Sequence, residues 1–167
     1  QINLVAPFSL TPGTTHIELR LAGTLVLALD RAVTPTHPAF FTTSGLRSGP
    51  LAALNQDGTV NSAVNPAAAG SIVSIFATGL GAMTPTPLDG SIPQAPGFQP
   101  AAPFSFQLFI VLAGGFVPEI DYIGNAPGLV QGAIQINFRL PPVTPFDGTV
   151  TALSGNTGTI WVFAKSQ

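Results

Sequence analysis

Short apolar runs separated by glycine and proline recur along the whole chain and restrict the folds open to it. The run HIELRLA, which begins at His16, alternates apolar with charged residues, and GAIQINFRL at 132–140 alternates apolar with polar residues. A period of two is typical of a strand with one buried face, whereas an amphipathic helix needs apolar residues three and four positions apart. No segment shows convincing helical periodicity. The sequence therefore predicts an all-β fold.

The expected strands are separated by recognisable turn residues. Ala22-Gly23 lies between the two strands of a predicted hairpin, and Asp57-Gly58 is a strong hairpin-turn signal. The proline-rich segments 34–45 and 79–103 are expected to be loops. The predicted strands are 16–22, 24–30, 71–78, 104–113, 116–123, 132–140, 148–154 and 159–165.

Charged residues are sparse. Only 7% of residues are charged, against about 25% in ordinary soluble domains, and the formal net charge is −2. Binding of nucleic acid or of an anionic membrane surface needs clustered lysine and arginine, so both functions are excluded. A weakly charged, apolar surface suits a protein that packs against neighbouring molecules. Alternatively, the threonine, serine, asparagine and glutamine residues keep the chain soluble without charge.

Three further features narrow the class of protein. The chain contains no cysteine, which excludes disulfide bridges, thiolate zinc sites and a cysteine nucleophile. Its longest apolar run, 108–117, is about half of the ~20 residues that a membrane helix needs, so membrane insertion is not expected. No signal peptide is visible, and a start at Gln1 suggests a processed or excised chain.

One segment occurs twice. The opening QINLVAP matches QINFRLP at 135–141 in four of its seven positions, and with one residue inserted the Gly-Thr pair at Gly13 matches the pair at Gly148. A predicted hairpin follows each copy. Three predicted strands precede the second copy, and none precedes the first. We therefore expect the first copy to belong to a module that lacks its upstream strands.

These patterns divide the chain into three parts. Residues 71–167 are predicted to form an immunoglobulin-like antiparallel β-sandwich. Residues 1–36 are predicted to form an incomplete module of the same kind, with only its last three strands. Residues 37–70 are predicted to be a proline-rich connector with a β-hairpin. A three-stranded apolar remnant has an open edge and an unburied face, so another surface is expected to cover it.

Several spaced motifs are similar to a known family. They are an Ala-Ala-x-Asn-x-Asp-Gly-x-x-Asn-Ser hairpin at 52–62, an Asn-Pro-Ala-x-x-Gly-Ser strand entry at 65–71, Thr-Gly-Leu-Gly at 78–81 and Ala-Pro-Gly-Leu-x-x-Gly-x-x-Gln-Ile-Asn at 126–137. In this order they resemble an uncharacterised C-terminal domain family abundant in Solibacter and other Acidobacteria, and 71–165 looks like an IPT/TIG-type module. The resemblance implies secreted proteins with immunoglobulin-like repeats. The family has no established catalytic residues to transfer.

Residues able to carry chemistry are few. His16 and His37 are the only histidines, and neither lies in a serine-hydrolase motif. Glu119 and Asp121 could pair as in a glycosidase, but a solvated strand edge is the simpler interpretation. We expect no catalytic residue, and we interpret the chain as a non-enzyme.

The Asp-Gly pairs at Asp57 and Asp89 could supply oxygen ligands to calcium. Both pairs also fit ordinary turns, in which the carboxylate bonds to nearby backbone and glycine takes a positive φ. The turn interpretation is preferred, so no metal site and no cofactor are expected.

The preferred hypothesis is an extracellular structural protein, a filament or surface-assembly subunit, whose copies polymerise by strand completion between neighbours. Phe40 and Phe41 lie in the polar connector, where they serve either as a plug under it or as an anchor into a neighbour. The alternative hypothesis is a C-terminal cell-surface adhesion or carbohydrate-binding module cut from a longer secreted protein. The residues expected at the assembly interface are Ile2, Leu4, Phe8, Phe40 and Phe41.

Overall fold

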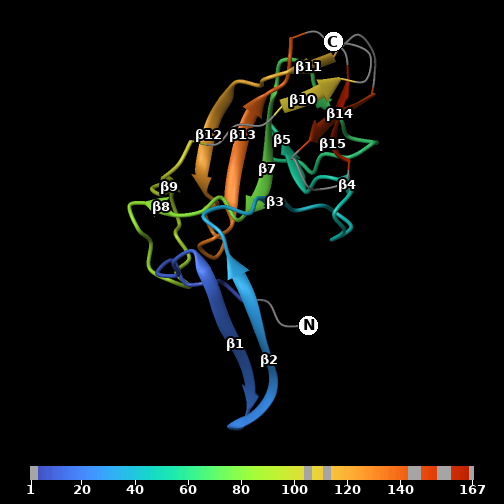
Figure 1. The fold of residues 1–167 in the computed structure, drawn as a ribbon. Coiled ribbons are helices and arrows are strands. Elements are labelled where there is room, and N and C mark those ends of the chain that lie inside the picture. Colours follow the sequence, from blue (N-terminus) through green and yellow to red (C-terminus); the bar gives the residue numbers. More distant parts are fainter. Residues whose placement is uncertain (1–3, 104–106, 111–113, 143–147, 154–158, 166–167) are drawn as a thin grey trace.

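The chain forms several β-sheets, and the part of it that the structure describes contains no helix (Figure 1). The computed structural model describes residues 4–103, 107–110, 114–142, 148–153 and 159–165. It describes only the backbone of 107–110, 114–116 and 148–153. The all-β prediction is confirmed.

Two larger sheets make up the body of the molecule. The five-stranded sheet contains β12 (Ile120–Asn125), β13 (Ile134–Arg139), β7 (Ile72–Thr78) and β3 (Ala39–Phe40) in that order, and β5 (Ala53–Asn55) also pairs with β7. The six-stranded sheet contains β11 (Gly114–Phe116), β10 (Gln107–Ile110), β14 (Gly148–Leu153), β15 (Ile160–Lys165) and β4 (Gly49–Pro50), and β6 (Ala67–Ala68) also pairs with β15.

Two small sheets lie outside the body sheets. One is the hairpin of β1 (Gly13–Leu21) and β2 (Thr24–Val33), and the other pairs β8 (Met83–Thr84) with β9 (Gln99–Pro100). The predicted hairpin at the N-terminal end is therefore confirmed. It forms a sheet of its own, separate from those of the body.

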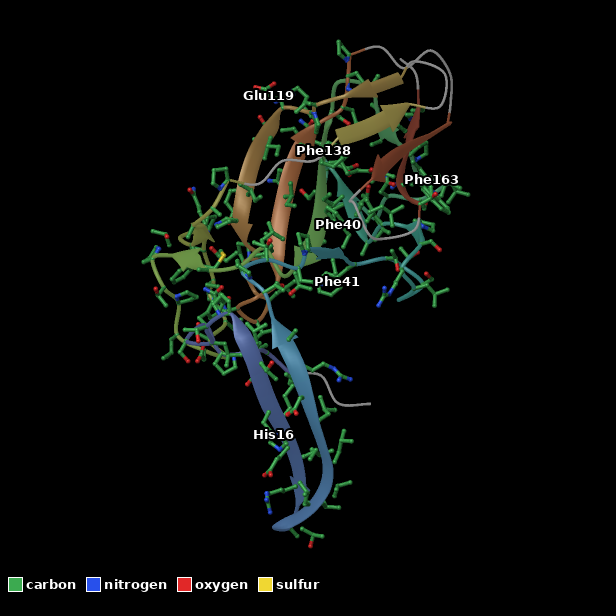
Figure 2. The ribbon with its side chains drawn as sticks, in the orientation of Figure 1. His16, Phe40, Phe41, Glu119, Phe138 and Phe163 are labelled. Carbon is green, nitrogen blue, oxygen red and sulfur yellow. The ribbon has the colours of Figure 1, made fainter. Side chains whose placement is uncertain are left out.

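The two larger sheets share one apolar core. Burial alternates along β7, β13 and β15, as the period of two predicts. The inward residues of all three strands belong to a single cluster. Phe138, on β13, is fully buried in it (Figure 2). Each large apolar side chain buried there contributes about 1.5–3 kcal/mol by leaving water, and the shared core gives the body a sandwich-like form.

The segment expected to be a connector, 37–70, supplies strands to both larger sheets. β3 and β5 pair with β7 in one sheet, while β4 and β6 pair in parallel with β15 in the other. All strand pairings between described residues of 71–165 are antiparallel, as expected. The parallel pairings come from 49–50 and 67–68, whose short strands carry too little pattern to be read from sequence.

The strands predicted at 104–113 and 116–123 agree with the structure in part. β10 covers 107–110, and the rest of the first prediction mostly lies outside the described residues. In the second, β11 ends at Phe116 and β12 begins at Ile120. Pro118 lies in the gap because it has no N–H to donate to a ladder. β12 is an edge strand with a bulge beside Ile120.

A buried asparagine joins the connector to the last strand. Asn61 is 2% exposed. Its Nδ2 donates to the carbonyl oxygen of Phe163 (2.7 Å) and to Oδ1 of Asn55 (2.8 Å), and its Oδ1 accepts the N–H of Phe163 (2.8 Å). The side chain thus satisfies both backbone groups of Phe163, as a neighbouring strand would.

Asn125, the last residue of β12, fixes the end of the loop between β8 and β9. It is fully buried, and its Oδ1 accepts the N–H groups of Gly97 and Phe98, each at 3.0 Å. Its Nδ2 donates to the carbonyl oxygen of Ala95 at 3.0 Å. The single side chain of Asn125 therefore satisfies backbone groups of residues 95–98 that a neighbouring strand would otherwise satisfy.

Candidate interaction site

The β1–β2 hairpin extends away from one end of the body, opposite the end where β11 and β14 lie (Figure 1). Its turn is Ala22-Gly23, and both residues have the positive φ that a type I′ turn requires (48° and 84°). Leu19 pairs with Leu27 and Arg20 with Leu25, so Val26 is the extra residue of a bulge. The turn prediction is confirmed.

One face of the hairpin is apolar. Ile17 pairs with Leu29, and Leu19 pairs with Leu27, so these four side chains share a face. Leu27 is 49% exposed, and Ile17 and Leu29 are only half-buried. No described residue covers this face, which we call the apolar hairpin face. It consists of Ile17, Leu19, Leu21, Leu27, Leu29 and Val33.

The opposite face of the hairpin carries charges. Nδ1 of His16 lies 2.7 Å from the carboxylate of Asp30, and Nε of Arg20 donates to Glu18 at 2.8 Å. All four side chains are at least a third exposed. Glu18 also lies 3.7 Å from the ring of His16. Apart from Arg31, which pairs with Thr15 on the apolar face, and Leu25, which pairs with Arg20, the hairpin is therefore amphipathic, with charge on one side and aliphatic side chains on the other.

The pKa of His16 is predicted to lie above its ordinary value of 6.5, because its ring hydrogen-bonds to Asp30 and lies near the charge of Glu18. Because the pKa is raised in the folded state, the pairing stabilises the hairpin fully below a pH of about 6.5. This stabilisation is lost as the pH rises through the folded-state pKa. An NMR titration of His16 checks the value. Asp30→Asn should move it back toward 6.5, and an unchanged titration in that variant would contradict the assignment.

An open groove lies at the base of the hairpin. It has a volume of about 1360 Å³ and is bounded by the N-terminal segment 4–12, the hairpin exit 32–37, the loop 78–83 and residues 130–134. Most of its exposed lining is apolar. Val33 lies in this lining, and by the period of two it also belongs to the apolar hairpin face. The apolar hairpin face and the groove are therefore continuous.

The groove wall contains an unsatisfied polar side chain. Gln131 is fully buried, and neither Oε1 nor Nε2 of its amide has a hydrogen-bond partner. Its backbone N–H donates to the carbonyl oxygen of Ser91 at 2.9 Å, which fixes its position. A buried amide without partners costs about 1–3 kcal/mol, so such a group calls for an explanation.

The predicted interface residues fall into different environments. Leu4 is 69% exposed, and Phe8 is half-buried, with its N–H donating to the carboxylate of Asp89 at 2.8 Å. Phe40, on β3, packs against the core, whereas Phe41 is 44% exposed and lines the groove (Figure 2). Phe40 thus fits the plug interpretation and Phe41 does not. Ile2 lies outside the described residues.

The third strand expected in the N-terminal part, packed against another surface, is not formed by residues 4–12 in the single chain, and its formation against a neighbour stays a prediction. In the repeat, Leu4 corresponds to Phe138. β13, which contains Phe138, is hydrogen-bonded to β12 on one side and to β7 on the other. Residues 4–12 have no such neighbours among the described residues, so no ladder holds them as a strand.

The residues considered for catalysis or metal binding have structural partners. Arg139 lies 3.6 Å from Glu119 and 3.4 Å from Asp121, which forms an exposed ion-pair group at the edge of β12. The carboxylate of Asp57 accepts the N–H (3.0 Å) and the hydroxyl (2.6 Å) of Thr59, and these bonds lower its pKa. The turn interpretation of Asp57 is confirmed.

The two histidines are not brought into one site. His16 lies on the extended hairpin, far from the core (Figure 2), and the backbone N–H of His37 donates to Gly79 at the base. Within the described ranges, no group of three or more histidine and carboxylate side chains is placed to hold a metal ion. The same residues include no helix long and apolar enough to cross a membrane.

Comparison with known proteins adds no relative. No protein-family model matches the chain, and no curated protein or solved structure shows significant similarity to it. The family resemblance of the motifs therefore stays a prediction.

Sequence reasoning missed the groove and Gln131. The groove forms where four distant segments meet, and nothing in their order along the chain marks that meeting point. Gln131 lies in a glycine-containing stretch before β13, where a polar residue is usually exposed.

Proposed function

We propose that this chain is an extracellular structural protein, a subunit of a filament or surface assembly, whose copies contact one another through the β1–β2 hairpin. The observation that carries the proposal is the apolar hairpin face, which no described residue covers. A hairpin of two strands is marginally stable alone in water and needs packing or more strands. Its two outer edges also present unpaired backbone groups that favour pairing with another chain.

The internal repeat supports the view that this face is built to be buried. β1 begins at Gly13 and β14 begins at Gly148, as the repeat aligns them. In the second copy, the β15 positions that pair with β14 include Ile160 and Val162, each 1% exposed. Their counterparts on β2 by the same pairing are Leu29 and Arg31. Leu29 thus occupies a core position of the repeat without a core around it, and Arg31 is a departure from the pattern.

The proposal includes that the protein is secreted and is built from immunoglobulin-like modules. Two sheets around one core, with β13 in one sheet and the following hairpin β14–β15 in the other, are compatible with that architecture. The motifs that resemble a secreted family support an extracellular location. Sparse charge and abundant apolar residues fit a surface that is covered by neighbours.

Leu27→Glu tests the proposal. We expect it to weaken self-association by tenfold or more, because burial of a leucine is worth about 1.5–3 kcal/mol and a factor of ten corresponds to about 1.4 kcal/mol. Ala28→Glu is the matched control, since Ala28 is the next residue and pairs with Glu18 on the charged face. Analytical ultracentrifugation over a range of concentrations, with electron microscopy of the products, gives the readout.

Three outcomes are informative for this proposal. Assembly of the unmodified chain and of Ala28→Glu, but not of Leu27→Glu, supports it. A strictly monomeric unmodified chain contradicts assembly from copies and favours a module that contacts other parts of a longer secreted protein. Equal assembly of both variants would show that copies associate through another surface.

A further inference from the structure

We infer that the peptide bond between Arg47 and Ser48 is a processing site, at which an endopeptidase specific for arginine cleaves the folded chain into two parts that stay together. Water adds across the bond in this step: its hydroxyl joins the carbonyl carbon of Arg47, and its proton joins the nitrogen of Ser48. The inference goes beyond the proposed function and does not depend on it, because it concerns the loop between β3 and β4 rather than the hairpin.

Arg47 differs from the other basic residues in its place in the fold. The chain has five lysine and arginine residues, and the structure describes all of them. Arg20 lies on β1, Arg31 on β2, Arg139 on β13 and Lys165 on β15, whereas Arg47 lies in a loop. Trypsin-like endopeptidases select a basic residue before the cleaved bond through a carboxylate in their specificity pocket. Folded proteins are cut preferentially at exposed loops, so Arg47 is the basic residue best placed for cleavage.

The backbone around this bond is open to a protease. Arg47 and Ser48 are exposed, and Leu46, which precedes them, is 67% exposed. Among the described residues, no backbone hydrogen bond holds the carbonyl group of Arg47 or the N–H of Ser48, and the guanidinium has no ion-pair partner. The carbonyl oxygen of Lys165, by contrast, accepts the N–H of Ala69 at 3.0 Å. A protease therefore reaches the bond after Arg47 without breaking a sheet.

Cleavage after Arg47 needs only a local opening of the loop. Oγ1 of Thr42 donates to the carbonyl oxygen of Leu46 at 2.6 Å, and the N–H of Gly45 donates to the carbonyl oxygen of Thr42 at 3.2 Å. Water can replace these bonds, because they lie in an exposed turn. At the base of the loop, the N–H of Thr43 donates to the carbonyl oxygen of Pro50 at 2.9 Å. The tip can therefore extend along a protease while the base stays in place.

The arginines of the hairpin are exposed too, but a strand ladder holds them. Arg20 pairs with Leu25, and Arg31 pairs with Thr15. A protease binds its substrate as an extended segment through main-chain hydrogen bonds, which a paired strand already uses for its neighbour. Cleavage at either residue therefore requires that the β1–β2 hairpin opens first.

The two parts of a cleaved chain remain joined by contacts that do not involve the cut bond. In the N-terminal part, β3 pairs with β7, and Phe40 packs against the core. The N–H of Phe41 donates to the carbonyl oxygen of Phe76 at 2.9 Å, and the N–H of His37 donates to that of Gly79 at 2.8 Å. Cleavage therefore gives a two-chain body with the hairpin still attached.

Limited proteolysis of the whole folded chain with trypsin tests the inference. We expect the first products to be 1–47 and 48–167, with cleavage after Arg47 at least tenfold faster than after any other basic residue, as measured by mass spectrometry over time. Arg47→Gln should remove both products. Arg31→Gln is the matched control, because it also removes an exposed arginine, and it should leave them unchanged. The two parts should elute together in native size-exclusion chromatography and separate in urea.

Three results would overturn the inference. First cleavage after Arg20 or Arg31 would mean that the hairpin opens more readily than the loop. A chain that resists trypsin, under conditions that digest the unfolded chain, would mean that the loop does not open to a protease. Parts that separate without denaturant would reject the two-chain product. Each of these results leaves the contact between copies untouched, since Leu27→Glu tests that contact separately.

Discussion

Gly79→Ala is expected to destabilise the protein by about 3 kcal/mol or more. Gly79 has a φ of +76°, which costs other residues about 1–2 kcal/mol, and an added Cβ would overlap the carbonyl oxygen of His37. That oxygen belongs to backbone, so it moves only if the segment moves. The N–H of His37 donates to the carbonyl oxygen of Gly79 at 2.8 Å, and displacement of the segment would lose this bond too. Urea unfolding measures the loss.

Gly90→Ala is the matched control for this prediction. Gly90 has a similar φ of +71°, but nothing lies within 4 Å of an added Cβ. It should cost only the conformational part, about 1–2 kcal/mol. A loss of equal size in both variants would mean that the contact between His37 and Gly79 does not restrict the chain. Because His37 is the last residue of the hairpin exit, Gly79→Ala should also loosen the attachment of the hairpin to the body.

Asn61→Ala is expected to cost about 3 kcal/mol. The substitution removes three hydrogen bonds and leaves the N–H and C=O of Phe163 and Oδ1 of Asn55 without their partner in a largely buried region. Each unsatisfied buried group costs about 1–3 kcal/mol, reduced where water can enter. Thermal and urea unfolding give the measurement, and hydrogen exchange of the Phe163 amide reports the lost bond directly.

Asn65→Ala separates this effect from a general loss of asparagine. Asn65 is exposed, and its Nδ2 donates to Oγ1 of Thr59 and to the carbonyl oxygen of Val60. Water can replace those bonds, so a cost of about 1 kcal/mol or less is expected. If Asn61→Ala proved as mild as Asn65→Ala, the bonds to β15 would not be what holds the connector in place.

Much of the fold could be predicted from the local pattern of the sequence. β7, β13 and the β1–β2 hairpin were predicted because alternation and turn residues act over neighbouring positions. The pairing of 49–50 and 67–68 with β15 was not predicted, since two-residue strands carry no periodicity and their partner lies far along the chain. Only the assembled core brings them together.

The interface prediction illustrates the same limit. The sequence marked Phe40 and Phe41 as a pair outside any strand pattern, yet β3 turns one toward the core and leaves the other at the groove. Successive side chains of an extended backbone point to opposite sides, and Phe41 directly follows β3, so the two phenylalanines are directed to different surroundings. The alternation of apolar and charged residues predicted that one face of the hairpin would be apolar. That this face is continuous with the groove could not be predicted, because the continuity depends on how residues 32–37 and 78–83 lie in space.

The link between Asn61 and Phe163 has a consequence for the order in which the chain folds. The two residues are 102 positions apart, and β15 also pairs with strands from the first half of the chain. The sandwich-like body cannot close until the last strand has been synthesised, whereas the β1–β2 hairpin needs only contacts within 21 residues of sequence. During synthesis, the amphipathic hairpin is therefore complete well before the groove that lies at its base.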